Sequence, residues 1–114
     1  MRILNKPIKK ADLIKTSTNF IDDNAIKGVV DIKRELLAVD SPMYYDCEQL
    51  LLSNGSNQVD LWGINLCLDS EDINDLVEFD SMINIRPSQG NRTRSVEDVA
   101  TQAKIKEVVS KWLI

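Results

Sequence analysis

The segment from Arg86 to Asp98, with the sequence RPSQGNRTRSVED, carries the residues best suited to binding chemistry. Arg86, Arg92 and Arg94 all come before its first acidic residue, and Gly90 can adopt backbone angles that other residues avoid. Guanidinium groups and oriented backbone N–H groups both bind phosphate and carboxylate oxygens. The segment is therefore interpreted as an anion-binding or partner-binding loop, with the candidate contact residues Arg86, Ser88, Gln89, Gly90, Asn91, Arg92 and Arg94.

Two other interpretations of this loop stay open. The stretch from Asp69 to Asp80 contains six acidic residues and no basic residue, so the arginines could simply form ion pairs with it. Alternatively, the loop could belong to an interface with another protein. If Asp98 caps a helix, its carboxylate already occupies the first N–H groups of that helix. An anion would then depend on the arginines and Gly90 alone.

A second set of polar residues is expected to share one face of a sheet. Glu78, Asp80 and Asn84 occupy alternate positions of a predicted strand, and such side chains point the same way. Residues of neighbouring strands would join them on that face. The face is most simply the solvated side of a sheet that helices cover on its other side. Its predicted members are Asp31, Asn65, Glu78, Asp80 and Asn84.

Three of these carboxylates support an alternative function, which is metal-assisted phosphoryl transfer or hydrolysis. Asp31, Glu78 and Asp80 could hold Mg²⁺ through oxygen atoms, while Arg86 or Arg92 clamps a phosphoryl group. Alternating acids are common on exposed strands, however. The pattern therefore identifies no catalytic residue and no metal ligand.

The composition excludes several other classes of function. Histidine is absent, which removes imidazole bases, Ser/His/Asp and Cys/His triads and the common zinc motifs. The two cysteines, Cys47 and Cys67, have no metal-like spacing and are expected to be reduced thiols. The net charge of −4 disfavours nucleic acid as a partner. No membrane span or secretory signal is recognisable, so we expect a cytoplasmic protein without a cofactor.

Hydrophobic periodicity and turn residues predict the elements that position these side chains. The strand from Ile26 to Val39 alternates apolar and polar residues, and the strand from Val59 to Leu68 places Trp62 on its core face. The remaining predicted elements are a strand over Arg2–Leu4, a helix from Pro7 to about Phe20, a helix from Asp46 to Leu52 closed by Asn54 and Gly55, and a strand over Val77–Arg86.

The last helix can be placed more sharply than the others. If it began at Val96, its apolar residues would point in two nearly opposite directions at 100° per residue. An N-cap at Asp98 places Val96 in the preceding loop and leaves one apolar stripe. The helix is therefore predicted to run from Val99 to about Leu113.

These elements predict one domain over residues 1–114. Its expected fold class is α+β, with a small antiparallel sheet of three to four strands packed on one face by two or three helices.

Two long segments carry a resemblance to a known family. They are LLLSNGSNQVDLWGINL and EFDSMINIRPSQGNRTRSVED, and their most specific parts are DLWGINL at residues 60–66 and FDSMINIRPSQGNR at residues 79–92. Both resemble a family of small bacterial proteins known only as a domain of unknown function. The resemblance implies a stand-alone bacterial protein, but no activity, cofactor or partner.

The favoured function is a non-enzymatic binding or interaction protein whose functional surface is the segment 86–98. A small anion or a protein is the expected partner, and a sheet this small leaves edges that a homo-oligomer would cover. Nucleic acid is not expected, because the net charge is negative and no aromatic stacking platform is evident.

Overall fold

The computed structural model describes residues 1–114, which form six strands, four α-helices and three short 3₁₀ helices. The strands are β1 (Arg2–Ile3), β2 (Phe20–Asp22), β3 (Ala25–Asp31), β4 (Leu36–Val39), β5 (Leu61–Cys67) and β6 (Val77–Glu78). The helices are α1 (Lys10–Thr16), α2 (Tyr44–Ser53), α3 (Ile73–Leu76) and α4 (Val99–Trp112), and the 3₁₀ helices are η1 (Gln58–Asp60), η2 (Met82–Asn84) and η3 (Pro87–Gln89).

All strands belong to one antiparallel sheet, in the order β1-β4-β3-β5-β6, with β2 paired to β3. The prediction of three to four strands was wrong. The predicted strand over Ile26–Val39 is a hairpin, because the carboxylate of Asp31 accepts hydrogen bonds from the backbone N–H groups of Lys33 and Arg34 and turns the chain. The helix predicted from Pro7 to about Phe20 is shorter, with α1 ending at Thr16, and strand β2 begins at Phe20.

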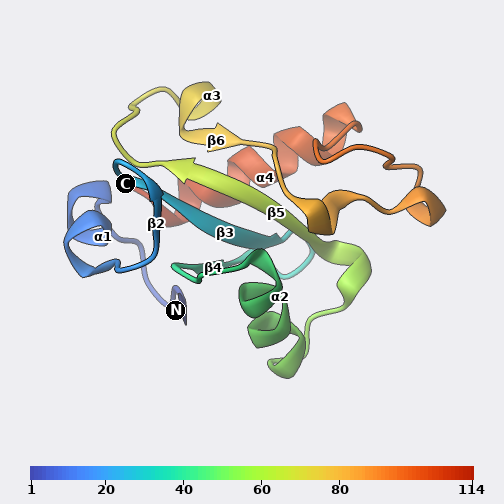
Figure 1. The fold of residues 1–114 in the computed structure, drawn as a ribbon, viewed down its shortest axis with the longest axis horizontal. Helices are drawn as coiled ribbons and strands as arrows, with labels where there is room; N and C mark the ends of the chain where they lie inside the picture. Colours follow the sequence, from blue (N-terminus) through green and yellow to red (C-terminus); the bar gives the residue numbers. More distant parts are fainter.

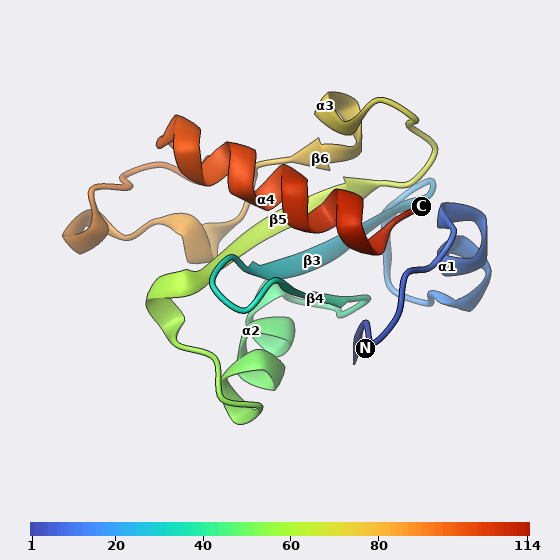
Figure 2. The ribbon, with the colours of Figure 1, turned by 180° about the vertical axis from the view of Figure 1, so that it is seen from behind.

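Helices cover both faces of this sheet, so the expectation of helices on one face was also wrong. Helix α4 lies across one face and α2 against the other, as Figures 1 and 2 show from opposite sides. The larger core cluster is on the α4 side and contains Trp62, Ile64 and Ile105. A smaller cluster, including Val29 and Leu51, lies under α2. Each face of β5 is therefore apolar over part of its length.

Two predictions about the last helix, α4, were confirmed. Asp98 is the N-cap of α4, because its side chain accepts a hydrogen bond from the N–H of Thr101. Val96 lies outside the helix and is fully buried.

None of the helices combines the length and apolar character that a membrane crossing requires.

The predicted strand over Val77–Arg86 was wrong after its first two residues. Strand β6 ends at Glu78, and the chain then passes through η2 and η3. The side chain of Asn84 continues the pairing with β5 in place of a backbone strand. Its Oδ1 accepts from the N–H of Gly63 at 2.8 Å, and its Nδ2 donates to the carbonyl of Gly63 at 2.9 Å.

Candidate functional site

The two segments DLWGINL (residues 60–66) and FDSMINIRPSQGNR (residues 79–92) pack against each other. Gly63, in the middle of β5, is the contact point, since a Cβ there would lie 2.4 Å from Ser81 Oγ. Ser81 is fully buried, and the same Cβ would also lie 2.6 Å from Ser81 Cβ and 3.0 Å from Ile83 Cγ1. The glycine of DLWGINL is therefore required by the approach of the segment that leads into Arg86.

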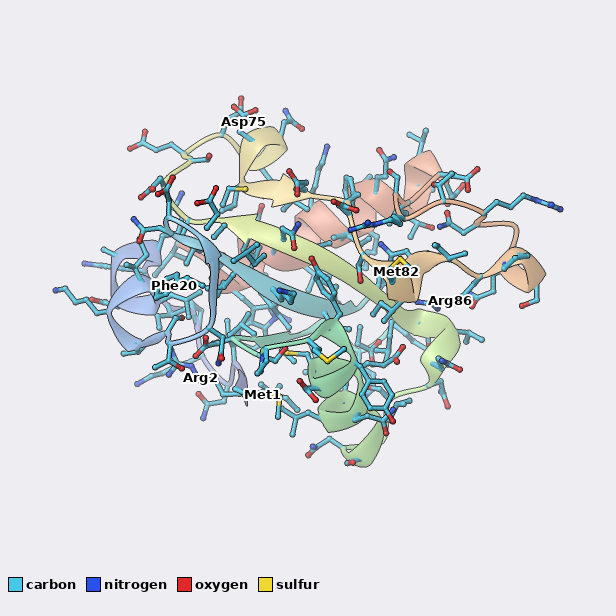
Figure 3. The ribbon with its side chains drawn as sticks, viewed as in Figure 1. Met1, Arg2, Phe20, Asp75, Met82 and Arg86 are labelled. Carbon is cyan, nitrogen blue, oxygen red and sulfur yellow. The ribbon has the colours of Figure 1, made fainter.

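Arg86 is a structural residue of this contact. Its Nε donates to the carbonyl of Ile83, Nη1 donates to the carbonyl of Gln58 at 2.8 Å, and Nη2 donates to the carbonyl of Leu61. Its guanidinium carbon also lies 4.5 Å from the centre of the Trp62 ring, a cation–π arrangement. Figure 3 shows the side chain beside the start of β5. Burial lowers the pKa of Arg86, and the nearby carboxylate of Glu48 opposes that change.

Asn91 fixes the rest of the segment from inside. The residue is 3% exposed, and its Nδ2 lies within hydrogen-bonding distance of the carbonyls of Asn84, Thr93 and Ser95. Its Oδ1 accepts from the N–H of Glu97 at 2.8 Å. Gly90 has a φ of +79°, the left-handed conformation expected of a glycine in this turn. Residues 86–98 thus form a cross-linked loop.

The other predicted contact residues differ in their availability. Ser88 and Arg92 are exposed and form no side-chain hydrogen bond or ion pair within the chain. Gln89 is exposed, but its amide bonds to Arg86 Nη1 and to the carbonyl of Val59. Arg94 forms an ion pair with Asp80 at 2.7 Å, which is the internal pairing considered from the sequence.

A hollow of about 350 Å³ lies between this segment, η1 and the first turn of α4. Its volume is at the low end of the roughly 300–1,000 Å³ typical of small-molecule pockets. The residues of its wall come from four separate parts of the chain, and they are Ile32, Val59, Trp62, Gln89, Gly90, Asn91, Glu97, Asp98 and Thr101.

Trp62 is the residue of this wall that the sequence identified only as a core anchor. Its side chain is in the core and the residue is 6% exposed, yet its buried Nε1–H has no hydrogen-bond acceptor. The other tryptophan, Trp112, donates its Nε1–H to the carbonyl of Glu35 at 2.8 Å. A buried donor without an acceptor costs about 1–3 kcal/mol. The sequence carried no signal of this difference, because it depends on tertiary contacts.

The acidic part of the wall is at the start of α4. Glu97 accepts the N–H groups of Arg92 and Thr93 through Oε2, and Asp98 accepts the N–H and the hydroxyl of Thr101 through Oδ2. The two hydrogen bonds from Thr101 lower the pKa of Asp98. Glu97 thus holds the loop, and Asp98 holds the start of α4, each through one carboxylate oxygen.

The predicted polar sheet face forms only in part. Asn65 and Glu78 are cross-strand partners, and Asn65 Nδ2 donates to Glu78 Oε1 at 2.7 Å. The hydroxyl of Tyr44 donates to Asn65 Oδ1, and the Lys27 ammonium lies 5.4 Å from the centre of the Tyr44 ring. Burial, with Asp80 adding to it, raises the pKa of Tyr44. The sequence missed Lys27 because its place opposite Asn65 depends on strand register, and it missed Tyr44 because that residue comes from α2, whose packing on the sheet is a tertiary contact.

The remaining members of that predicted face lie elsewhere. Asn84 is fully buried against Gly63, and Asp31 is fully buried at the β3–β4 turn, where Ser56 also donates to its carboxylate at 2.6 Å. In the sheet register Asp31 is opposite Leu61, whereas Glu78 is opposite Asn65. The two residues therefore lie on opposite sides of β5 and four positions apart along it, about 13 Å at strand spacing. Asp31, Glu78 and Asp80 are not brought together, and no group of three possible metal ligands occurs.

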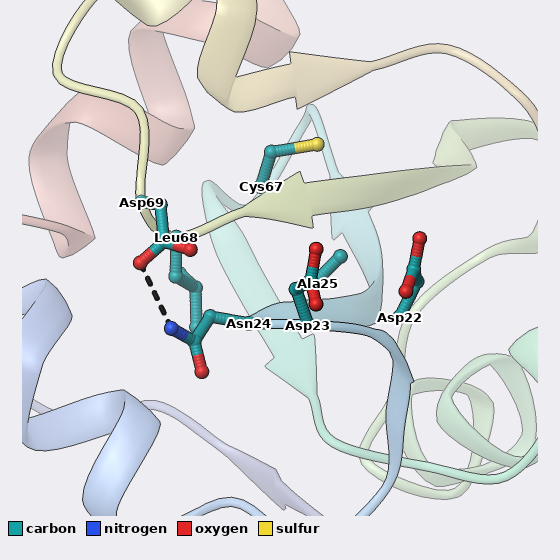
Figure 4. Close-up of a pocket in the computed structure, with 7 residues that line it drawn as sticks. All are labelled: Asp22, Asp23, Asn24, Ala25, Cys67, Leu68 and Asp69. Atoms are coloured by element: carbon teal, nitrogen blue, oxygen red, sulfur yellow. Dashed lines mark hydrogen bonds between the residues drawn. The ribbon is translucent and has the colours of Figure 1, made fainter.

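A second hollow, of about 210 Å³, lies at the β2–β3 turn beside the end of β5. Figure 4 shows the carboxylates of Asp22, Asp23 and Asp69 around it, with Asn24 donating to Asp69 at 2.9 Å. Cys67 also lines it, and burial raises the pKa of this thiol. No basic residue lines this hollow.

The model of a family described as "Protein of unknown function (DUF5674)" matches residues 2–112. No curated protein and no solved structure matches the chain.

Proposed function

Because this chain belongs to the family described as Protein of unknown function (DUF5674), we propose its function from geometry: it is a non-enzymatic binding domain. Its functional surface is the segment 86–98 together with the hollow beside Trp62, and its ligand is a small molecule. The proposed binding site is the wall of the hollow. It is not formed by the guanidinium groups of Arg86, Arg92 and Arg94, which the sequence had suggested as contacts.

The observation that carries the proposal is the unpartnered Nε1–H of Trp62. The side-chain amides of Gln89 and Asn91, which line the same hollow, are both hydrogen-bonded. A donor left without an acceptor in such a saturated region is the group with most to gain from an external acceptor. Trp62 lines the hollow, so a ligand bound there would lie against this tryptophan.

The loop around the hollow favours binding because its shape is fixed before a ligand arrives. Arg86 and Asn91 tie the segment to β5 and to itself through backbone carbonyls. A preorganised wall loses little conformational entropy when it binds. A fixed wall favours one ligand shape, whereas an adaptable surface would accept several.

The chain provides an internal control for testing this proposal, because it has two tryptophans. We would record the indole N–H signals of the ¹⁵N-labelled protein while adding a panel of small amines, sugars and carboxylates. A ligand of the hollow should shift the Trp62 indole signal and leave that of Trp112 in place. The proposal fails if binding compounds move only Trp112 or residues remote from the hollow, or if nothing in a broad panel moves Trp62.

A protein partner on the same surface is the second candidate. Apolar side chains around the segment are exposed, with Met82 at 63%, Val59 at 59% and Val99 at 76%. Exposed apolar residues beside arginines are typical of interfaces. If that partner is a second copy, light scattering should show a dimer that Met82→Asp dissociates, whereas a monomer at all concentrations contradicts the homo-oligomer.

A further inference from the structure

We infer that the outer edge of β1 is a docking site for an extended acidic segment of a partner protein. The sheet order places β1 at one end, with β4 and β3 between it and β5, the strand that carries Trp62. Figure 2 shows the N-terminal segment at the margin of the sheet, beside β4. The site is therefore separate from the hollow beside Trp62 and does not depend on the binding function proposed there.

The backbone of β1 leaves hydrogen-bonding groups unused on its outer side. Ile3 is opposite Ala38 of β4, and the N–H of the next residue, Leu4, donates to the carbonyl of Leu37 at 2.9 Å. Because hydrogen-bonded and non-hydrogen-bonded positions alternate along an antiparallel pair, the N–H and C=O groups of Ile3 point away from β4. The N–H of Asn5, two residues further on, donates to no group of the chain either. An extended segment adds to a sheet as a further strand at an unpaired edge of this kind.

A hollow of about 280 Å³ follows the same stretch of chain. Sheets that bind an added strand use backbone hydrogen bonds for affinity and hollows beside the edge to recognise its side chains. This edge has both features within a few residues. The wall consists of three apolar residues, Ile3, Leu4 and Ile8, and three polar residues, Arg2, Asn5 and Lys6.

Charge complementarity determines the kind of segment that fits. Arg2 and Lys6 are exposed, and neither forms an ion pair within the chain. Lys6 makes no side-chain hydrogen bond, and Arg2 makes one, from Nη2 to the hydroxyl of Thr16 at 2.8 Å. The wall contains no carboxylate. Two positive charges beside a free edge therefore favour a strand that carries acidic side chains.

A second copy of this chain is a poor occupant of the edge. Two copies paired through β1 would place the basic side chains of one beside those of the other, and like charges oppose such a pairing. The acidic stretch of another copy, residues 69–80, is not an extended segment, because Ile73–Leu76 form α3 and only Val77–Glu78 are a strand. The occupant is therefore a segment of a different protein.

Three short peptides blocked at both ends test this inference. The first alternates glutamate with valine, the second has lysine in place of glutamate, and the third is the acidic peptide with every backbone nitrogen methylated. Each would be titrated into the ¹⁵N-labelled protein at low salt. The acidic peptide should shift the N–H signals of Ile3 and Asn5 and slow their exchange with solvent, whereas the N–H of Leu4, which is already bonded to Leu37, should change little. The other two peptides should bind at least about tenfold more weakly, because one loses the charge attraction and the other loses its backbone donors.

Two matched double variants each remove two positive charges. Arg2→Ala with Lys6→Ala removes the charges of the wall and should weaken binding of the acidic peptide about tenfold. Lys9→Ala with Lys15→Ala removes two exposed lysines that do not line the hollow, and it should change that binding by less than about twofold.

Each part of the inference has its own contradicting result. Equal binding of the methylated peptide, or unchanged exchange at Ile3 and Asn5, would overturn the addition of a strand. Equal binding of the lysine peptide, or equal effects of the two double variants, would overturn the acidic class of partner. If the acidic peptide shifts none of these signals, the edge is not a docking site. Slow exchange of Ile3 in the protein alone, together with a dimer in light scattering, would show that a second copy covers the edge instead.

Discussion

Two neighbouring regions of this chain differ in whether their buried polar groups have hydrogen-bond partners. The first, here called the support, consists of Asn84, Arg86 and Asn91, whose side chains make three, four and four hydrogen bonds. The second is the hollow lined by Trp62, a residue whose buried indole N–H has no acceptor. The support holds the loop in place, whereas the indole N–H of Trp62 has no partner within the chain. Residue type does not predict this difference, because an arginine belongs to the structural region and a core tryptophan to the open one.

The support should be the region most sensitive to substitution. Asn91→Ala leaves the carbonyls of Asn84 and Ser95 and the N–H of Glu97 without their partner. We expect the free energy of unfolding to fall by about 3 kcal/mol, since several buried groups lose hydrogen bonds together. Urea unfolding followed by tryptophan fluorescence measures this loss.

Asn57→Ala is the control for that variant, because Asn57 is exposed and its side chain makes no hydrogen bond. Its free energy of unfolding should stay within about 0.5 kcal/mol of the parent protein. Equal effects of the two substitutions would show that the amide of Asn91 does not hold the segment.

Arg86→Lys tests whether the arginine supports the loop through its shape or through its charge. A lysine keeps the positive charge, but its single ammonium cannot donate to the carbonyls of Ile83, Gln58 and Leu61 at once. We expect a loss of about 2 kcal/mol in the free energy of unfolding. Arg92→Lys, at an exposed arginine of the same loop, should change it by less than about 0.5 kcal/mol. If Arg86→Lys is as mild, charge alone is sufficient at this position.

The sequence could predict the parts of this molecule that depend on local periodicity. The cap at Asp98, the loop position of Val96 and the two faces of β5 follow from apolar spacing over one element. The hairpin turn after Asp31 could not be predicted, because the alternation of apolar and polar residues continues through it from β3 into β4. The end of β6 was hidden as well, since a side chain, Asn84, replaces the expected strand pairing.

The candidate site was less accessible to sequence reasoning than the fold. Which arginines of the loop are free depends on contacts with residues far along the chain, such as the carbonyls of Gln58 and Leu61 for Arg86. The pairing of Arg94 with Asp80 was one of the open interpretations. The orphaned N–H of Trp62 depends on the absence of an acceptor in three dimensions, and no local pattern encodes that.

Glu48 extends the comparison to a buried group outside both regions. The residue is 4% exposed on α2, and its Oε2 has no hydrogen-bond partner. Its contribution should be opposite in sign to that of Asn91. Glu48→Met should raise the free energy of unfolding by about 1 kcal/mol, because replacing a poorly paired buried charge by an apolar group is often stabilising.

The comparison for this variant is Glu107→Met on the exposed side of α4, where the side chain is 66% exposed and no change beyond about 0.5 kcal/mol is expected. A marked loss of stability in Glu48→Met would mean that the carboxylate supports Arg86 through their mutual attraction, and Glu48 would then belong with the support.

The smallest effect is expected at the ion pair between Arg94 and Asp80, which belongs to neither region. The two side chains are 54% and 45% exposed, so water and salt screen their attraction even at 2.7 Å. A double-mutant cycle with Arg94→Ala and Asp80→Ala should give a coupling energy below about 0.5 kcal/mol, which high salt should reduce further. A coupling above about 1.5 kcal/mol at high salt would place this pair within the support, and the loop would then be held from its exposed side as well as from inside.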